Sequence, residues 1–430
     1  MNTQLIICLV IFVLTLISFI LNKIPMWLTA MMSLAALFIT GCIDATGALG
    51  GLANVNTVLM ATMFIVAAGF RRTSMVDTMC KAILKLTKGS FRIAFFGYLV
   101  LTVLLANFIA SPMVVYAVVS PLLCALCDEA NVKRSKYLFP MMVTAISTCG
   151  ILPGPTAIQM AGQFDGFLKT YQFTETFSPM NFFIGEWPVM IIVIVWAVFL
   201  APKFLPEKEV AIAANATAVK KEGKKTELSK LSDIAGIIIF FGTILVLIFA
   251  SQLKLQTWWV ALVGSLLMVL FGVVDNKSAL RDIPWDMIML YVGALALGTG
   301  LTNTGAGTLI GNALANVVGG TQNNYVLGAL FFLIPFILTQ FMLNRAVSAV
   351  FVPICLLTCQ AIGANPIGLI ILVNAGSLTA FMTPMATPAV PMCMADGGYE
   401  MKDLAKGGWL ISIVLSVFFI LYTMTVLPAF

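Results

Sequence analysis

The sequence predicts an all-α polytopic membrane protein, built from two inverted repeats of five transmembrane helices, each repeat with a re-entrant hairpin and a broken helix. Of its 430 residues, 60% are hydrophobic and only 10% are charged, whereas soluble domains have roughly 45–50% apolar and about 25% charged residues. Apolar runs of the length that a bilayer requires recur along the chain. Their order before a single long polar stretch is repeated after it.

The first repeat is expected to occupy residues 1–202, and glycine, proline and serine mark two interruptions in its apolar runs. Ala110-Ser111-Pro112 divides a run of about two span lengths, with basic residues at both ends, which predicts a hairpin that returns to its starting side. Gly150 to Pro155 breaks a later crossing. The expected elements are crossings at 4–21, 26–42 and 57–70, an amphipathic helix at 71–88, the hairpin at 93–126, the broken crossing at 137–163 and a last crossing at 182–200.

A polar stretch at 205–232 separates the halves, and the same order then recurs in a second repeat at 232–430. Residues 203–231 are therefore predicted to be a linker. The expected elements of the second repeat are crossings at 234–250, 258–274 and 288–300, an amphipathic segment near 309–317, a hairpin at 326–357 interrupted at Asn344-Arg345, a crossing broken at 383–388 and a last span at 409–427.

Charge predicts the orientation of the chain. Five crossings are an odd number, so the second repeat must be inserted upside down. If the linker is cytoplasmic, only Lys169 and Lys254 among the assigned basic residues face outward, which is the bias of the positive-inside rule. We therefore expect a multi-pass protein of the inner (plasma) membrane with a cytoplasmic linker and external termini. In a protein surrounded by a lipid bilayer, the net charge of +6 concerns the side of the membrane that the basic residues face. No nucleic acid partner is expected.

The composition argues against an enzyme. Histidine is absent, so histidine general-base chemistry and the commonest neutral metal ligand are excluded. The sequence has no HExxH motif, and no cofactor is expected. The acidic residues Asp44, Asp165, Glu186 and Asp286 fall at predicted span ends, which leaves no evident buried carboxylate to relay protons.

The interruptions predict a secondary transporter, with its substrate site where the helices break. Broken helices at membrane depth are tolerated where they line a cavity. Half-helix N-termini favour anions, and freed carbonyls and hydroxyls favour a small cation. Arg345 is predicted to lie deep in the bilayer, where its planar guanidinium suits a carboxylate, sulfate or phosphate; the alternative is that it caps the hairpin turn. The other candidate substrate-binding residues are Ser111, Thr156, Asn344, Ser348, Thr383, Thr387 and Pro388.

A C-terminal motif resembles the divalent anion/sodium symporter family, the carriers of dicarboxylates, citrate and sulfate. The motif runs from Ala380 through Thr383-Pro384-Met385-Ala386-Thr387-Pro388 to Gly397-Gly398-Tyr399 and Gly407-Gly408. The resemblance implies a homodimer in which a domain of hairpins and broken helices carries a small anion by an elevator-type motion. It also implies sodium as the coupling ion, held at the hairpin tips and helix breaks; the matching positions are Ser111, Gly150 and Asn344.

The hairpin tips differ from that family's Ser-Asn-Thr pattern. They read Ala110-Ser111-Pro112 and Leu343-Asn344-Arg345. A guanidinium close to a second sodium would repel it by roughly 4 kcal/mol at 4 Å and an effective dielectric constant of 20. We therefore expect at most one coupled sodium. The alternatives are an anion exchanger or an arsenite-type permease of the same superfamily without sodium coupling.

Overall fold

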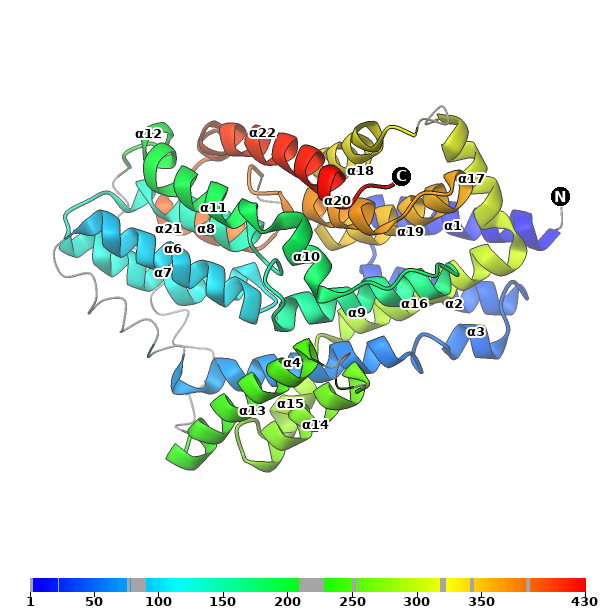
Figure 1. The fold of residues 1–430 in the computed structure, drawn as a ribbon, viewed down its shortest axis with the longest axis horizontal. Coiled ribbons are helices and arrows are strands. Elements are labelled where there is room, and N and C mark those ends of the chain that lie inside the picture. The colour runs from blue at the N-terminus through cyan, green and yellow to red at the C-terminus, as the bar shows by residue number, and fades with distance from the viewer. Residues whose placement is uncertain are drawn as a thin grey trace.

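The structure is a computed structural model, and it describes residues 3–21, 23–75, 78, 90–208, 228–249, 253, 255–317, 322–340, 344–383 and 387–430. Within these ranges the chain forms helices and no strand (Figure 1). Five helices of this part are long and apolar enough to cross a membrane, and a bent pair would make a sixth. Several shorter apolar helices accompany them. The protein is thus an all-α polytopic membrane protein, as the composition predicted.

The helices of the first half follow the predicted order. They are α1 (Thr3–Leu21), α2 (Met26–Ile39), α3 (Ala45–Leu49), α4 (Val55–Arg72), α6 (Phe91–Phe108), α7 (Pro112–Glu129), the 3₁₀ turn η1 (Arg134–Lys136), α8 (Leu138–Ser147), α9 (Pro155–Thr170), α10 (Pro179–Glu186), α11 (Pro188–Val195), the π-helical turn η2 (Trp196–Leu200) and α12 (Ala201–Phe204).

The second half repeats this order after the polar stretch. Its helices are α13 (Lys230–Ile248), α14 (Thr257–Leu270), α15 (Asn276–Arg281), α16 (Trp285–Thr304), α17 (Ala306–Val317), α18 (Asn324–Thr339), α19 (Asn344–Ile362), α20 (Ile367–Leu378), α21 (Ala389–Gly397) and α22 (Met401–Val426).

The predicted interruptions are confirmed as gaps between helices. Residues 109–111 separate α6 from α7, and these two helices pack against each other as the arms of a hairpin, as do α18 and α19. Residues 148–154 separate α8 from α9, and residues 379–388 separate α20 from α21. Glycine and proline cause the first of these breaks, because Gly150 has a left-handed φ of +84° and Pro155 can only begin the next helix.

Three details differ from the sequence expectations. The crossing predicted at 182–200 is bent by 48° between α10 and α12, where Pro188 begins α11 and cannot continue the hydrogen bonding of α10. Two short helices that apolar periodicity could not reveal, α3 and α15, are each capped by an aspartate side chain. The second hairpin is interrupted before Asn344, since α19 already begins there. Most of the amphipathic helix predicted at 71–88, most of the 205–232 linker and part of the 383–388 break lie outside the described residues.

The two halves pack against each other through equivalent helices. Helix α2 of the first half contacts α16 of the second, and α4 contacts α14. Gly293 allows the α2–α16 approach, because a Cβ atom there would lie 2.5 Å from the backbone oxygen of Ala30. Small residues of this kind let membrane helices pack closely. The hairpins and broken helices lie beside these helices in Figure 1.

Candidate functional site

The first hairpin is joined to the first helix break by Asn107, a fully buried residue in the last turn of α6. Its amide nitrogen donates to the backbone oxygen of Thr148 at 3.0 Å, and its amide oxygen accepts from the backbone N–H of Leu152 at 2.7 Å. Thr156, at the start of α9, donates its hydroxyl to the oxygen of Ala106 at 3.4 Å. Asn107 therefore satisfies backbone groups that the break leaves without helical partners.

The second hairpin is joined to the second break by Thr339 and Gln340, both buried. The hydroxyl of Thr339 donates to the backbone oxygen of Ser377 at 2.7 Å, and the amide nitrogen of Gln340 is 3.4 Å from the backbone oxygen of Thr379. In return, the hydroxyl of Thr383 donates to the backbone oxygen of Gln340.

These contacts correspond between the two halves. Asn107 and Gln340 each lie four residues before the residue at which the second hairpin arm starts, Ser111 and Asn344. Each donates to the residue directly after the first half of the broken helix, which is Thr148 or Thr379. The sequence analysis missed both residues. An amide side chain four positions before each tip was the available signal.

The two correspond in position, but their amide oxygens differ. The oxygen of Asn107 has the N–H of Leu152, whereas the Oε1 atom of Gln340 is buried and has no hydrogen-bond partner among the described residues. The Asn107 side chain therefore contacts the first break through a donor and an acceptor, whereas the Gln340 side chain contacts the second break through a donor only.

Two helices begin at the breaks without a side-chain cap from the residue that precedes them. Gly154 precedes α9 and Pro388 precedes α21, and neither provides a side-chain cap. The hydroxyl of Ser111 caps α7 only at 3.5 Å. Several carbonyls nearby, in contrast, already accept from Asn107, Gln340, Thr156 or Thr383. Helix N-termini without a side-chain cap attract anions. The two breaks are therefore suited to hold an anion.

The predicted site residues form two groups. Ser111, Gly150 and Thr156 lie at the first hairpin and break, and Asn344 and Thr383 lie at the second. There the Oδ1 atom of Asn344 is 2.8 Å from the Thr339 hydroxyl, whose one proton it shares with the backbone oxygen of Ser377. Thr387 and Pro388 directly precede α21, and Ser348 is half-buried one turn into α19. The two groups belong to neighbouring elements, because α21 packs against both α7 and α8.

Arg345 is half exposed and forms an ion pair with an acidic residue of α16. Its side chain is 51% exposed in the described protein, and its Nη1 atom lies 3.3 Å from Oδ2 of Asp286 in the first turn of α16. The described partner is thus a carboxylate of α16, and the carbonyls at 341–343, which the capping interpretation would use, lie outside the described residues. An ion pair with both partners half exposed contributes about 0–1 kcal/mol, so another carboxylate can displace Asp286 at little cost.

The expectation that no carboxylate is buried is wrong for Glu186. This residue ends α10 at the bend before α11 and is only 4% exposed, with its Oε1 atom unpartnered among the described residues. Its interaction with Cys149 places it beside the first helix break. The position along the apolar run suggested a span end. The bend and the packing of α9, α20 and α22 around α10 bury it instead.

The fold and the joined hairpins and breaks define a membrane transporter, not an enzyme. The chain belongs to the citrate transporter family, whose profile matches residues 16–374 and 244–429. The resemblance to divalent anion/sodium symporters is confirmed by relatives of that kind. One is the sodium-dependent dicarboxylate transporter SdcS of Staphylococcus saprophyticus, 22% identical over 400 residues that cover 85% of this chain and 75% of the relative.

Other relatives match over shorter regions. An uncharacterized transporter of Haemophilus influenzae is 30% identical over 158 residues, which cover 37% of this chain and 34% of the relative. Human solute carrier family 13 member 2 is 27% identical over 143 residues, 33% of this chain and 24% of the relative. These matches thus span only about a third and a quarter of the relatives' own length.

Two solved structures share the fold. The Alcanivorax borkumensis YdaH transporter, described as having an unusual topology, superposes with a TM-score of 0.62 at 14% identity and covers 89% of both chains. Neisseria gonorrhoeae MtrF, described within a class of antimetabolite efflux pumps, gives a TM-score of 0.60 at 13% identity over 99% of this chain and 94% of its own. At these identities the likeness concerns the fold alone.

Proposed function

We propose that this secondary transporter moves a small di- or tricarboxylate, or a sulfate-like anion, coupled to sodium. One observation carries the proposal: uncapped N-termini of α9 and α21 adjoin two breaks whose carbonyls are engaged by the facing hairpins. Such N-termini supply backbone donors for an anion. The names of SdcS and of related carriers supply the substrate class and the ion.

The residues proposed to hold the anion are those at the two hairpins and breaks. Thr156 and Thr383 provide hydroxyls at the breaks, and Arg345 provides a guanidinium that exchanges Asp286 for a substrate carboxylate. Ser111, Asn344, Ser348, Thr387 and Pro388 complete the proposed site at the hairpin arms and the start of α21.

For sodium we propose oxygen ligands from Ser111, the backbone near Gly150 and Asn344. Sodium is a hard cation that takes hydroxyl and carbonyl oxygens, as calcium and magnesium do. The Asn344 oxygen already accepts from Thr339, and the positive charge of Arg345 is adjacent in sequence. The proposed stoichiometry is therefore at most one sodium.

The proposed motion is that of an elevator. The hairpins and broken helices would move together, because Asn107, Thr339 and Gln340 join each hairpin to its break. The packed helices α2, α4, α14 and α16 would stay in place as the scaffold of a homodimer.

The two halves would be inverted repeats in the plasma membrane, with residues 203–231 cytoplasmic and both termini external. A cysteine at Phe430 should then react with an impermeant reagent from outside intact cells, and a cysteine at Ala214 should not.

The alternative is that transport is coupled to protons instead of sodium, and the observation that favours it is the buried carboxyl group of Glu186. Among the described titratable groups, Cys149 of the first helix break interacts with it, and none on α9, α20 or α22 does. If flux follows a proton gradient and not a sodium gradient, and Glu186→Gln abolishes that dependence, the coupling is to protons. Anion exchange would instead require no gradient of either ion. The described titratable groups on α9 and α22 are Asp165, Lys169, Lys402, Asp403, Lys406 and Tyr422.

Uptake by proteoliposomes tests the proposal directly. Labelled succinate, citrate and sulfate would be offered with and without an inward sodium gradient. We expect uptake of at least one of them, with a sodium Hill coefficient near one. Thr156→Val should reduce uptake, and Thr170→Val is its matched control because Thr170 is on the same helix and bonds only to its own turn. No uptake of any of these anions, or equal loss in both variants, would refute the proposed site.

A further inference from the structure

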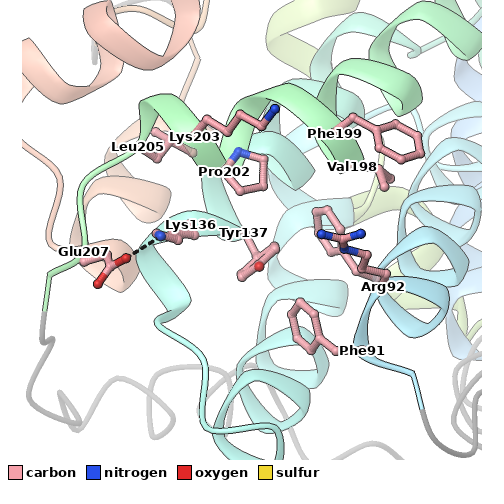
Figure 2. A pocket seen from close by; sticks show the side chains of 11 residues that line it. Phe91, Arg92, Lys136, Tyr137, Val198, Phe199, Pro202, Lys203, Leu205 and Glu207 are labelled. Atoms are coloured by element: carbon pink, nitrogen blue, oxygen red, sulfur yellow. Dashed lines mark hydrogen bonds and ion pairs between the residues drawn. The ribbon is translucent and has the colours of Figure 1, made fainter.

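A basic cavity lies at the linker-side end of the first hairpin, away from the helix breaks. Its volume is about 430 Å³, and it is enclosed by the start of α6, the residues around η1, and the segment from η2 to Glu207 (Figure 2). Three cationic side chains line it, Arg92, Lys136 and Lys203, against one carboxylate, Glu207. The cavity therefore has an excess of two positive charges.

Two of these cations have no counter-ion. Glu207 forms an ion pair with Lys136, which holds the pKa of the glutamate below its usual range. Arg92 and Lys203 make no hydrogen bond or ion pair with any described residue, although Arg92 interacts with the nearby Tyr137. Two unpaired cations on opposite walls of one cavity require an anion or water as partner.

The walls of the cavity are aromatic. The rings of Phe91 and Phe95 meet the ring of Tyr137 edge-on, with centroids 4.6 and 4.9 Å away, and Phe199 lies on the opposite side of the cavity (Figure 2). Aromatic side chains of this kind mark the level where a membrane helix meets the headgroups.

The cavity continues onto an apolar surface. Ile93 and Phe96 of α6 and Phe199 of η2 are 60%, 48% and 59% exposed, which places an apolar face directly beside the unpaired cations. A free inorganic anion would use only the cations, whereas a phospholipid would use both features, with its phosphate on the cations and its acyl chains on the apolar face. Basic pockets between membrane helices on this side bind anionic headgroups in general.

We propose that this cavity is a binding site for the phosphate headgroup of an anionic membrane phospholipid, held by Arg92 and Lys203. Lys136 is neutralised by Glu207 and serves to fix the position of the η1 wall. The site is separate from the anion site at the helix breaks.

Native mass spectrometry of the detergent-purified full chain tests the proposal. The protein would be titrated with phosphatidylglycerol and with phosphatidylcholine of the same acyl chains. We expect preferential retention of phosphatidylglycerol, weakened roughly fivefold by Arg92→Gln or Lys203→Gln, because one cation near an anionic lipid surface is worth about that factor, and roughly thirtyfold by both. Arg92→Lys should retain most of the binding, and both single variants change exposed side chains that have no partner to lose.

The control is Lys277→Gln, which removes one exposed charge on α15, outside the cavity, and should not alter retention. An equal loss in this variant would show a general surface attraction and overturn the site. Equal retention of both lipids would overturn the headgroup assignment. Displacement of phosphatidylglycerol by millimolar inorganic phosphate would show a site for free anions and would also overturn the proposal, which expects the lipid to stay bound.

Discussion

Asn107 should contribute more to the stability of the transporter than its counterpart Gln340. In the Asn107→Ala variant the backbone oxygen of Thr148 and the N–H of Leu152 both lose the partner that the structure gives them, at 3.0 and 2.7 Å. In Gln340→Ala the second break loses only one long contact, from the amide nitrogen to the backbone oxygen of Thr379 at 3.4 Å; the other bond of that nitrogen, at 3.1 Å, goes to Phe336 of its own helix, and the side-chain oxygen has no partner among the described residues.

The magnitude follows from the number of groups left without a partner. A buried polar group that loses its hydrogen bond costs about 1–3 kcal/mol, whereas side-chain hydrogen bonds between membrane helices average only about 0.6 and reach about 1.7 kcal/mol. Between these limits, two backbone groups give roughly 2–4 kcal/mol for Asn107→Ala. The single long bond from Gln340 to Thr379 across the second break gives less than about 1 kcal/mol for Gln340→Ala.

Thermal unfolding of the purified variants, followed by tryptophan fluorescence in one detergent, measures the difference. Asn107→Ala should unfold at a clearly lower temperature than the parent protein, and Gln340→Ala should unfold within a few degrees of it. Equal destabilisation by the two substitutions, or a larger effect of Gln340→Ala, would show that the bonds of Asn107 do not hold the first break in place.

Four further substitutions test other features of the site and its surroundings. Arg345→Ala should abolish substrate binding with little change in unfolding temperature, since its pair with Asp286 is half exposed. Asp286→Asn breaks the same pair and should still bind substrate. A binding titration of both variants tests this, and equal loss of binding in both would contradict the role of Arg345. Gly150→Ala should cost about 1–2 kcal/mol because φ is +84°, and an unchanged or higher unfolding temperature would contradict this. The hydrogen bond from Lys136 lowers the pKa of Glu207, so the stability from this pair is complete above the unfolded-state pKa and is lost as pH falls through the folded-state value; acid titration of the unfolding temperature should be flatter for Glu207→Gln, and an identical acid limb would refute it.

The sequence by itself determined the membrane class, the order of the helices and the positions of their breaks. These features depend on local properties: the length of an apolar run, the left-handed conformation that Gly150 allows, and the inability of Pro155 to continue a helix. Each is fixed by a few consecutive residues, so it can be predicted without knowledge of what packs nearby. The C-terminal Thr-Pro motif further indicated the family.

Only the tertiary structure decided which polar groups meet. Asn107 and Thr148 are 41 residues apart, and Arg345 and Asp286 are 59 apart, so neither contact leaves a periodic trace in the sequence. Glu186 occupies a similar position along its apolar run to a surface carboxylate, yet the bend after α10 and three neighbouring helices bury it. Burial and hydrogen bonding depend on segments brought together from distant parts of the chain, and hydropathy, which averages over neighbours in sequence, contains no information about those segments.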